Sequence, residues 1–295
     1  MPEAGEAPRL NKPPKDILDL NKQPKYKPEP SQKFYDELPI AYKPEPEKFS
    51  GDFFAGNPNP RKPTFKEQIE KLLKAGAIAN YNRIVDLIIK TNSLEDLRSV
   101  VGDPNMRTLI VDKFRQKPEM ATAIMAALLK GSQKWENPTS NNFTSHFWDK
   151  KPGFLQYTDS MNCWEMIIYA AFLCGQLTAD QVRIFMKKAN YGLPNFSGMA
   201  MMGYQESLPF YVTLSNSKQP ATIRPLQPGQ LLFYRTSDRG NPDHVAIALG
   251  GGKAVSLWNQ PNNIDRIQII NVLALQDSIQ VGQPITEVMK GNQWK

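Results

Sequence analysis

Two residues of this sequence have the side chains of a nucleophile and its base. Cys163 is one of two cysteines, and His244 is one of two histidines. A cysteine becomes a nucleophile when its surroundings lower its pKa or when a neighbouring base takes its proton. Histidine is the side chain best suited to take a proton near neutral pH. The pair predicts a thiol mechanism, provided that the fold brings the two residues together.

The sequence around Cys163 predicts a helix that begins at the cysteine. Asn162 is a favourable N-cap residue, Glu165 follows at the spacing of a capping box, and Gly175 ends the helix. At the first helical position the thiol lies at the positive end of the helix dipole, which we expect to lower its pKa. The N–H of Cys163 has no partner within the helix and is available to an oxyanion.

Cys174 lies near the other end of the same predicted helix. At about 1.5 Å of rise per residue, its Cα atom would be roughly 16 Å from that of Cys163, whereas a disulfide needs Cα atoms within about 7 Å. We therefore expect no intrachain disulfide and a buried packing role for Cys174. This cysteine usage favours a protein of a reducing compartment, or one that works there after delivery.

The sequence around His244 predicts an antiparallel hairpin. Strands are expected at 231–234, 244–249 and 254–258, and Gly250–Gly252 form the loop between the last two. With all three glycines in the loop, Leu249 pairs with Lys253, and the next two residues inward, Ala248 and Ala254, pair with each other.

Alternation along these strands sorts their side chains onto two faces. His244 shares one face with mostly small residues, whereas larger apolar residues occupy the other face. Because small residues allow a helix to approach closely, we expect the cysteine helix to lie against the histidine face. The residues of the histidine face are Ala246, Ala248, Ala254, Ser256 and Trp258.

A catalytic histidine needs a partner that orients its second ring nitrogen. Asn259, fifteen residues after His244, is the favoured candidate because an amide oxygen accepts well from an imidazole N–H. Ser256, twelve residues after His244 and on its face, is the first alternative, and Gln260 or no third residue is the second. Gln156 could donate to the oxyanion, although an ordinary loop glutamine is the simpler interpretation.

These segments resemble the NlpC/P60 family and the wider papain-like superfamily. The stretch PGQLLFY at 228–234, followed by HVAIALGGGKAVS at 244–256, is similar to the NlpC/P60 pattern. Cys163-Trp164 resembles the Cys-Trp of papain-type peptidases, and the order of cysteine helix and histidine strand agrees. The resemblance covers about residues 150–262. It implies an α+β fold with a papain-like or NlpC/P60-like core, in which a Cys-bearing helix packs on an antiparallel sheet.

The sequence departs from NlpC/P60 enzymes around both residues of the pair. Asn162-Cys163-Trp164-Glu165 replaces the usual Asp-Cys-Ser-Gly, Gln230 replaces the family's Asp, and the gap from cysteine to histidine is longer than usual. In this the chain looks more like papain-fold toxin and effector domains. The resemblance implies a thiol hydrolase or amide transferase, a secreted bacterial toxin or effector that acts on protein or peptide amides. A peptidoglycan amidase or endopeptidase is the alternative.

The chain divides into three regions of different composition. Thirteen of the 25 prolines precede residue 64, which predicts a disordered arm over 1–64. The pentapeptide YKPEP occurs in it twice, at Tyr26–Pro30 and Tyr42–Pro46, and marks either a linker or docking motifs for a delivery apparatus or chaperone. Residues 65–132 predict a helical subdomain, and 133–295 the papain-like domain. A non-catalytic adaptor that works through the arm is a further alternative.

Other functional classes lack support in the sequence. The net charge of +7 comes without lysines and arginines interleaved with aromatics, so we expect no nucleic-acid partner. No run of 18 apolar residues predicts a membrane span, and Met1–Leu10 lacks the pattern of a Sec signal peptide, which favours another secretion route or a cytoplasmic protein. We expect no cofactor and no metal site, and we interpret His146 as structural.

Overall fold

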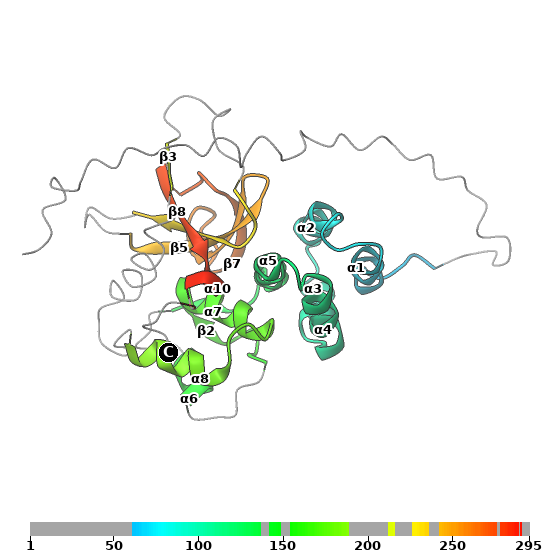
Figure 1. Cartoon of the computed structure of the whole chain (residues 1–295), viewed down its shortest axis with the longest axis horizontal. Coiled ribbons are helices and arrows are strands. Elements are labelled where there is room, and N and C mark those ends of the chain that lie inside the picture. Colours follow the sequence, from blue (N-terminus) through cyan, green and yellow to red (C-terminus); the bar gives the residue numbers. More distant parts are fainter. Residues whose placement is uncertain are drawn as a thin grey trace, which may run out of the picture. The chain divides into compact units, whose positions relative to one another are not determined.

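The computed structural model describes residues 61–136, 142–148, 154–188, 212–215, 226–235, 242–275, 278–288 and 290. They belong to one compact unit that begins at Arg61. This unit is a mixed α+β structure of helices and a curled, mainly antiparallel sheet (Figure 1). The predicted arm, with both YKPEP repeats, lies outside the described residues except for its last four positions.

A series of short helices precedes the sheet. They are α1 (Phe65–Lys74), α2 (Tyr81–Lys90), α3 (Leu94–Val101), α4 (Pro104–Lys113) and α5 (Pro118–Leu128). Side chains that cap the first turn begin three of them: Thr64 for α1, Ser93 for α3 and Asp103 for α4. Helix α5 contacts α2 and α3 as well as α7 and strand β5 (Figure 1), and its residues 121–128 are all buried. The helical region and the sheet therefore share one hydrophobic core.

The sheet has eight strands in the described part of the chain, in the order β2-β1-β7-β6-β5-β4-β8-β3. The strands are β1 (Lys134–Trp135), β2 (Ser160–Met161), β3 (Val212–Ser215), β4 (Gln230–Tyr234), β5 (His244–Gly250), β6 (Lys253–Trp258), β7 (Arg266–Asn271) and β8 (Ser278–Pro284). Neighbouring strands are antiparallel except for β1 and β2. The other helices are α6 (Phe143–Trp148), α7 (Cys163–Leu173), α8 (Ala179–Lys188) and α10 (Ile285–Val288). None of the described helices is long and apolar enough to cross a membrane.

The two faces of the sheet contribute to different hydrophobic clusters. We call the first the helix face, because its side chains join the core formed by the helices, and the second the inner face. The helix face carries Leu231, Phe233, Val245, Ile247, Leu249, Val255 and Leu257. The inner face carries Leu232, Tyr234, Ala246, Ala248, Ala254, Ile270 and Val281.

One hydrogen bond shows how strongly the sheet curls around its inner face. The hydroxyl of Tyr234 on β4 donates to the backbone carbonyl of Val272, just after β7, at 2.8 Å. In a flat sheet these two strands would be about 14 Å apart, because β5 and β6 lie between them. A tyrosine side chain cannot span that distance, so the sheet curls and the inner face lies on the inside. Small alanines on this face leave room for the curvature.

The predicted β5–β6 hairpin is correct at one pair and shifted at its tip. Ala248 pairs with Ala254 as expected, but Lys253 pairs with Gly250 instead of Leu249 because of an irregularity in the register. Gly250, Gly251 and Gly252 have φ angles of 81°, 56° and 73°. These left-handed angles favour glycine, which explains three glycines in succession at this turn.

Candidate functional site

Helix α7 begins at Cys163 as the sequence predicts. The side-chain oxygen of Asn162 accepts hydrogen bonds from the N–H groups of Trp164 (2.9 Å) and Glu165 (3.0 Å). The carboxylate of Glu165 accepts in return from the N–H of Asn162 at 2.6 Å, which completes the capping box. The cap fixes Cys163 as the first helical residue.

The sulfur of Cys163 is enclosed in the shared core, and the residue is only 1% exposed. The nearby backbone N–H groups of Val245 and Trp164 favour the thiolate form of Cys163. Burial nevertheless raises the pKa of the Cys163 thiol to about 12, because the charged form loses its water. The expected lowering of this pKa by the helix N-terminus is wrong in this conformation, since burial outweighs the backbone donors.

His244 is the first residue of β5 and lies opposite Tyr234 of β4. Its Nε2 atom lies 2.9 Å from the Oγ atom of Ser256. The imidazole stacks on the Trp258 ring with centroids 5.0 Å apart, and its centroid is 5.8 Å from that of Tyr234. The residue is 3% exposed, and burial lowers the pKa of the imidazole to about 3, which Asp243 offsets only in part. At neutral pH the imidazole is therefore uncharged.

The two candidate residues lie on different faces of the sheet: Cys163 packs against the helix face, and His244 belongs to the inner face. Helix α7 packs on the helix face, where the Trp164 ring lies 5.9 Å from that of Phe233. His244 instead shares the inner face with Tyr234 and Ser256. The expectation that the cysteine helix lies against the small-residue face is wrong. The small residues lie on the inside of the curled sheet, and the helices pack against the face with the larger apolar residues.

The backbone next to His244 acts on the Cys163 thiol. Val245, the neighbour of His244 in the chain, carries a backbone N–H that lowers the pKa of the Cys163 thiol. Among the described residues, no hydrogen bond joins the sulfur to the imidazole, and Nδ1 of His244 has no hydrogen-bond partner. The start of β5 therefore separates the two side chains in this conformation.

The structure pairs His244 with Ser256, the alternative, and not with the favoured Asn259. Asn259 follows the last residue of β6 and is exposed in a turn, where its backbone carbonyl accepts from the N–H of Ile264 at 3.0 Å. Gln260 is exposed in the same turn. Ser256 reaches the imidazole because it lies within β6, two residues before the strand ends, on the face that His244 also occupies.

Two other residues weighed from the sequence lie apart from the pair. Gln156 is exposed, and its backbone N–H donates to the Asp159 carboxylate at 2.7 Å. His146 belongs to α6, where its ring makes an edge contact with Phe147 at a centroid distance of 5.4 Å. In the part of the chain that the structure describes, no hydrogen bond or ring contact joins either residue to Cys163 or His244.

The structure adds two polar groups that the sequence reasoning missed. The side-chain nitrogens of Asn162 (Nδ2) and Trp164 (Nε1) are buried and have no hydrogen-bond partner among the described residues. They belong to the residues before and after Cys163. Asn162 was recognised only as a helix cap, which uses its oxygen and leaves the amide nitrogen available as a donor.

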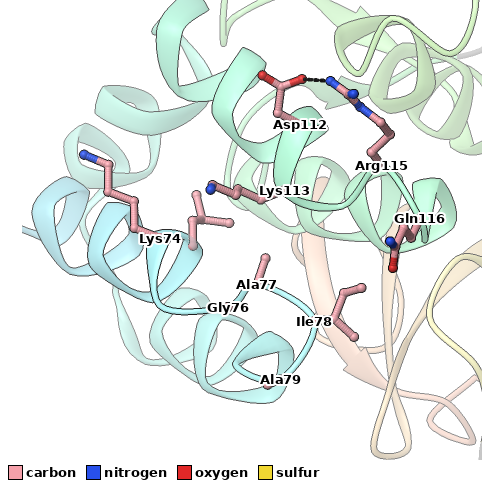
Figure 2. A pocket seen from close by; sticks show the side chains of 10 residues that line it. Lys74, Gly76, Ala77, Ile78, Ala79, Asp112, Lys113, Arg115 and Gln116 are labelled. Carbon is pink, nitrogen blue, oxygen red and sulfur yellow. Dashed lines mark hydrogen bonds and ion pairs between the residues drawn. The ribbon is translucent and has the colours of Figure 1, made fainter.

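Other ligand sites near the pair have little support among the described residues. Cys163 and Cys174 are both free and buried. No cluster of three or more His, Cys, Asp or Glu side chains suited to a metal ion occurs in the described ranges. Two hollows lie in the helical region, and neither is lined by Cys163 or His244. The larger one separates the α1–α2 turn from the end of α4 (Figure 2).

Comparisons of this chain with family models, curated proteins and solved structures find no match. The resemblance to papain-like enzymes therefore stays a prediction from the motif residues.

Proposed function

We propose that this protein is a cysteine-dependent amide hydrolase or transferase. Cys163 is the nucleophile, His244 is the base, and Ser256 orients the base. The observation that supports this most strongly is the 2.9 Å contact of His244 Nε2 with Ser256 Oγ at the start of β5. The residue that follows His244, Val245, carries a backbone N–H that lowers the pKa of the Cys163 thiol. The same arrangement supports a papain-like or NlpC/P60-like core within the α+β fold.

The reaction follows from the roles of these groups. Nδ1 of His244 takes the thiol proton, and the thiolate attacks the amide carbonyl carbon. The N–H of Cys163 stabilises the oxyanion, and the Nδ2 group of Asn162 is a second donor close in sequence. The imidazolium then protonates the leaving amine, which departs as the thioester forms. Water or an acceptor amine finally resolves the thioester and releases the thiol.

The described conformation is a resting state of this proposed reaction. Both side chains are buried, and the directions of their pKa shifts favour a neutral thiol and a neutral imidazole. Turnover therefore requires a second conformation in which the imidazole and the sulfur meet on one side of β5 and the substrate reaches them. The substrate class that we propose is a protein or peptide amide, as for a bacterial toxin or effector, with peptidoglycan as the alternative.

Mass spectrometry of substrates tests this proposal directly. Candidate target proteins and purified peptidoglycan are incubated with the wild type and with Cys163→Ala. A gain of one dalton indicates deamidation, a split indicates hydrolysis, and a larger added mass indicates transfer. Cys174→Ala is the matched control, because Cys174 is also buried and its pKa is also raised to about 12. A product formed equally by Cys163→Ala would exclude the proposed nucleophile.

A second candidate is a non-catalytic binding protein, which the burial of the pair favours. Cys163 and His244 are 1% and 3% exposed, as expected of side chains that only pack in a core. The working part would then be the arm over 1–64, which could bind a delivery apparatus or chaperone. Deleting this arm separates the two candidates: an enzyme keeps its turnover, whereas an adaptor loses its partner.

A further inference from the structure

A small hollow in the helical region combines apolar walls with a cation. Its volume is about 190 Å³, and it lies between α3, the end of α5 and the segment 154–157. The apolar walls come mainly from Leu97, Val101, Leu128, Phe154 and Tyr157. Two rim residues are unusually exposed for apolar side chains, Leu94 at 37% and Tyr157 at 44%. The hollow is distinct from the Cys163–His244 pair.

The cation is Arg98, whose guanidinium has no polar partner among the described residues. Its Cζ atom lies 3.7 Å from the centroid of the Tyr157 ring. Its Nε atom is buried without a hydrogen-bond partner, and no ion pair of Arg98 occurs in the described part of the chain. Because Nε is closed to solvent, a ligand oxygen reaches the guanidinium through its terminal Nη groups.

Arg115 shows the ordinary situation for an arginine in the same region. It lines the larger hollow, and its guanidinium lies 3.0 Å from the Asp112 carboxylate (Figure 2). By contrast, none of the described residues that line the hollow at Arg98 is a carboxylate. Its second cation, Lys130, already donates to the carbonyls of Ile89 (2.9 Å) and Thr91 (2.7 Å). Of the two described cations that line this hollow, Arg98 is thus the one available to an anion.

The wall opposite α3 is held in place by Gln133. This buried residue has a φ angle of 36°, which is rare for a residue other than glycine. Its N–H donates to the carbonyl of Tyr157 at 3.0 Å, and its side-chain amide donates to the carbonyl of Gln156 at 3.1 Å. These bonds fix the segment that carries the Tyr157 ring, so Arg98 and its stacking partner are positioned before any ligand arrives.

We propose that this hollow binds a carboxylate attached to a small apolar group. The guanidinium of Arg98 pairs with the carboxylate through its two terminal Nη groups, while the apolar walls hold the attached group. The volume equals about six water molecules at roughly 30 Å³ each, which suits one amino-acid residue. The ligand is either a free carboxylic acid or the C-terminal residue of a peptide.

Titration of the full-length protein with N-acetyl-leucine and its amide tests this site. The readout is the NMR signal of the Tyr157 ring in tyrosine-labelled protein, assigned with Tyr157→Phe. We expect saturable shifts with the acid, with a dissociation constant near 1 mM, and at least tenfold weaker binding of the amide, which lacks the charge. Arg98→Gln should weaken acid binding at least tenfold, and Arg98→Lys should weaken it severalfold because the planar fork is lost.

Arg115→Gln is the matched control, since it removes a paired arginine of the same region, and it should leave binding unchanged. A short peptide that ends in leucine distinguishes the two sources: tighter binding than N-acetyl-leucine indicates a peptide C-terminus, and equal or weaker binding indicates a free acid. Equal binding of acid and amide, unchanged binding in Arg98→Gln, or no saturable shift at about 10 mM acid would overturn the proposal.

Discussion

The two faces of strand β5 are equally buried but carry side chains of different size. On the helix face, Val245 and Ile247 are fully buried against the helices, and on the inner face Ala246 and Ala248 are fully buried within the curl. Side-chain size therefore follows the space on each face. The comparison also explains why the two candidate residues are separated: Cys163 packs against the helix face, whereas His244 lies on the inner face. Four changes to these two faces test this account.

The largest effect is expected on the helix face, at Trp164. Its side chain is fully buried against Phe185 and Phe233, with ring centroids 6.3 and 5.9 Å away. Trp164→Ala should lower the free energy of unfolding by about 3–5 kcal/mol, because it removes the contacts and leaves a cavity. Urea denaturation measures the loss. A loss below about 1 kcal/mol would mean that α7 does not pack on this face as described.

A smaller effect is expected from adding volume to the inner face. Ala248 lies directly opposite Ala254 inside the curl. Ala248→Leu should cost about 1–3 kcal/mol, because the added atoms find no space without a shift of the backbone. Ile247→Leu on the helix face is the control, since it conserves volume and should cost less than about 1.5 kcal/mol. Equal losses in both variants would contradict the assignment of the alanines to the inside of the curl.

Acid should weaken the fold through His244. Burial lowers the pKa of its imidazole from 6.5 to about 3, so the unfolded chain binds a proton that the folded protein excludes between these pH values. Titration of His244 leaves the free energy of unfolding unchanged above pH 6.5. Below that pH it lowers the free energy of unfolding by at most about 1.4 kcal/mol per pH unit. Thermal unfolding from pH 7 to 4 measures the slope. His244→Gln should flatten it, and the same slope in both proteins would exclude His244 as its source.

The smallest effect is expected at the hydrogen bond that crosses the inner face. Tyr234→Phe removes the hydroxyl that donates to the Val272 carbonyl and leaves that carbonyl unpaired in the interior. The expected loss is about 1 kcal/mol, with no change in fold. Chemical denaturation of the variant measures it, and near-ultraviolet circular dichroism checks that the fold is kept. A variant as stable as the wild type would show that this bond contributes nothing to holding the curl.

Local signals in the sequence were sufficient for the elements that carry the pair. The asparagine and glutamate of the capping box predicted the start of α7 at Cys163, and period-two alternation placed His244 and Ser256 on one face. The face covered by the helices could not be predicted, because both faces consist of residues suited to burial and only the curl distinguishes them. The enclosure of Cys163 depends on α7 and β5 meeting, so a thiol pKa inferred from the helix end alone had the wrong direction.

The reactivity of Cys163 relative to Cys174 tests the central claim most directly. Both thiols are buried, and burial raises both pKa values to about 12, so packing alone predicts equal and slow alkylation. Iodoacetamide labelling of the folded protein at pH 7, read by peptide mass spectrometry, compares them. The account predicts that Cys163 reacts at least about tenfold faster than Cys174 and that His244→Ala removes this difference. Equal rates in the wild type would contradict the proposed thiol chemistry.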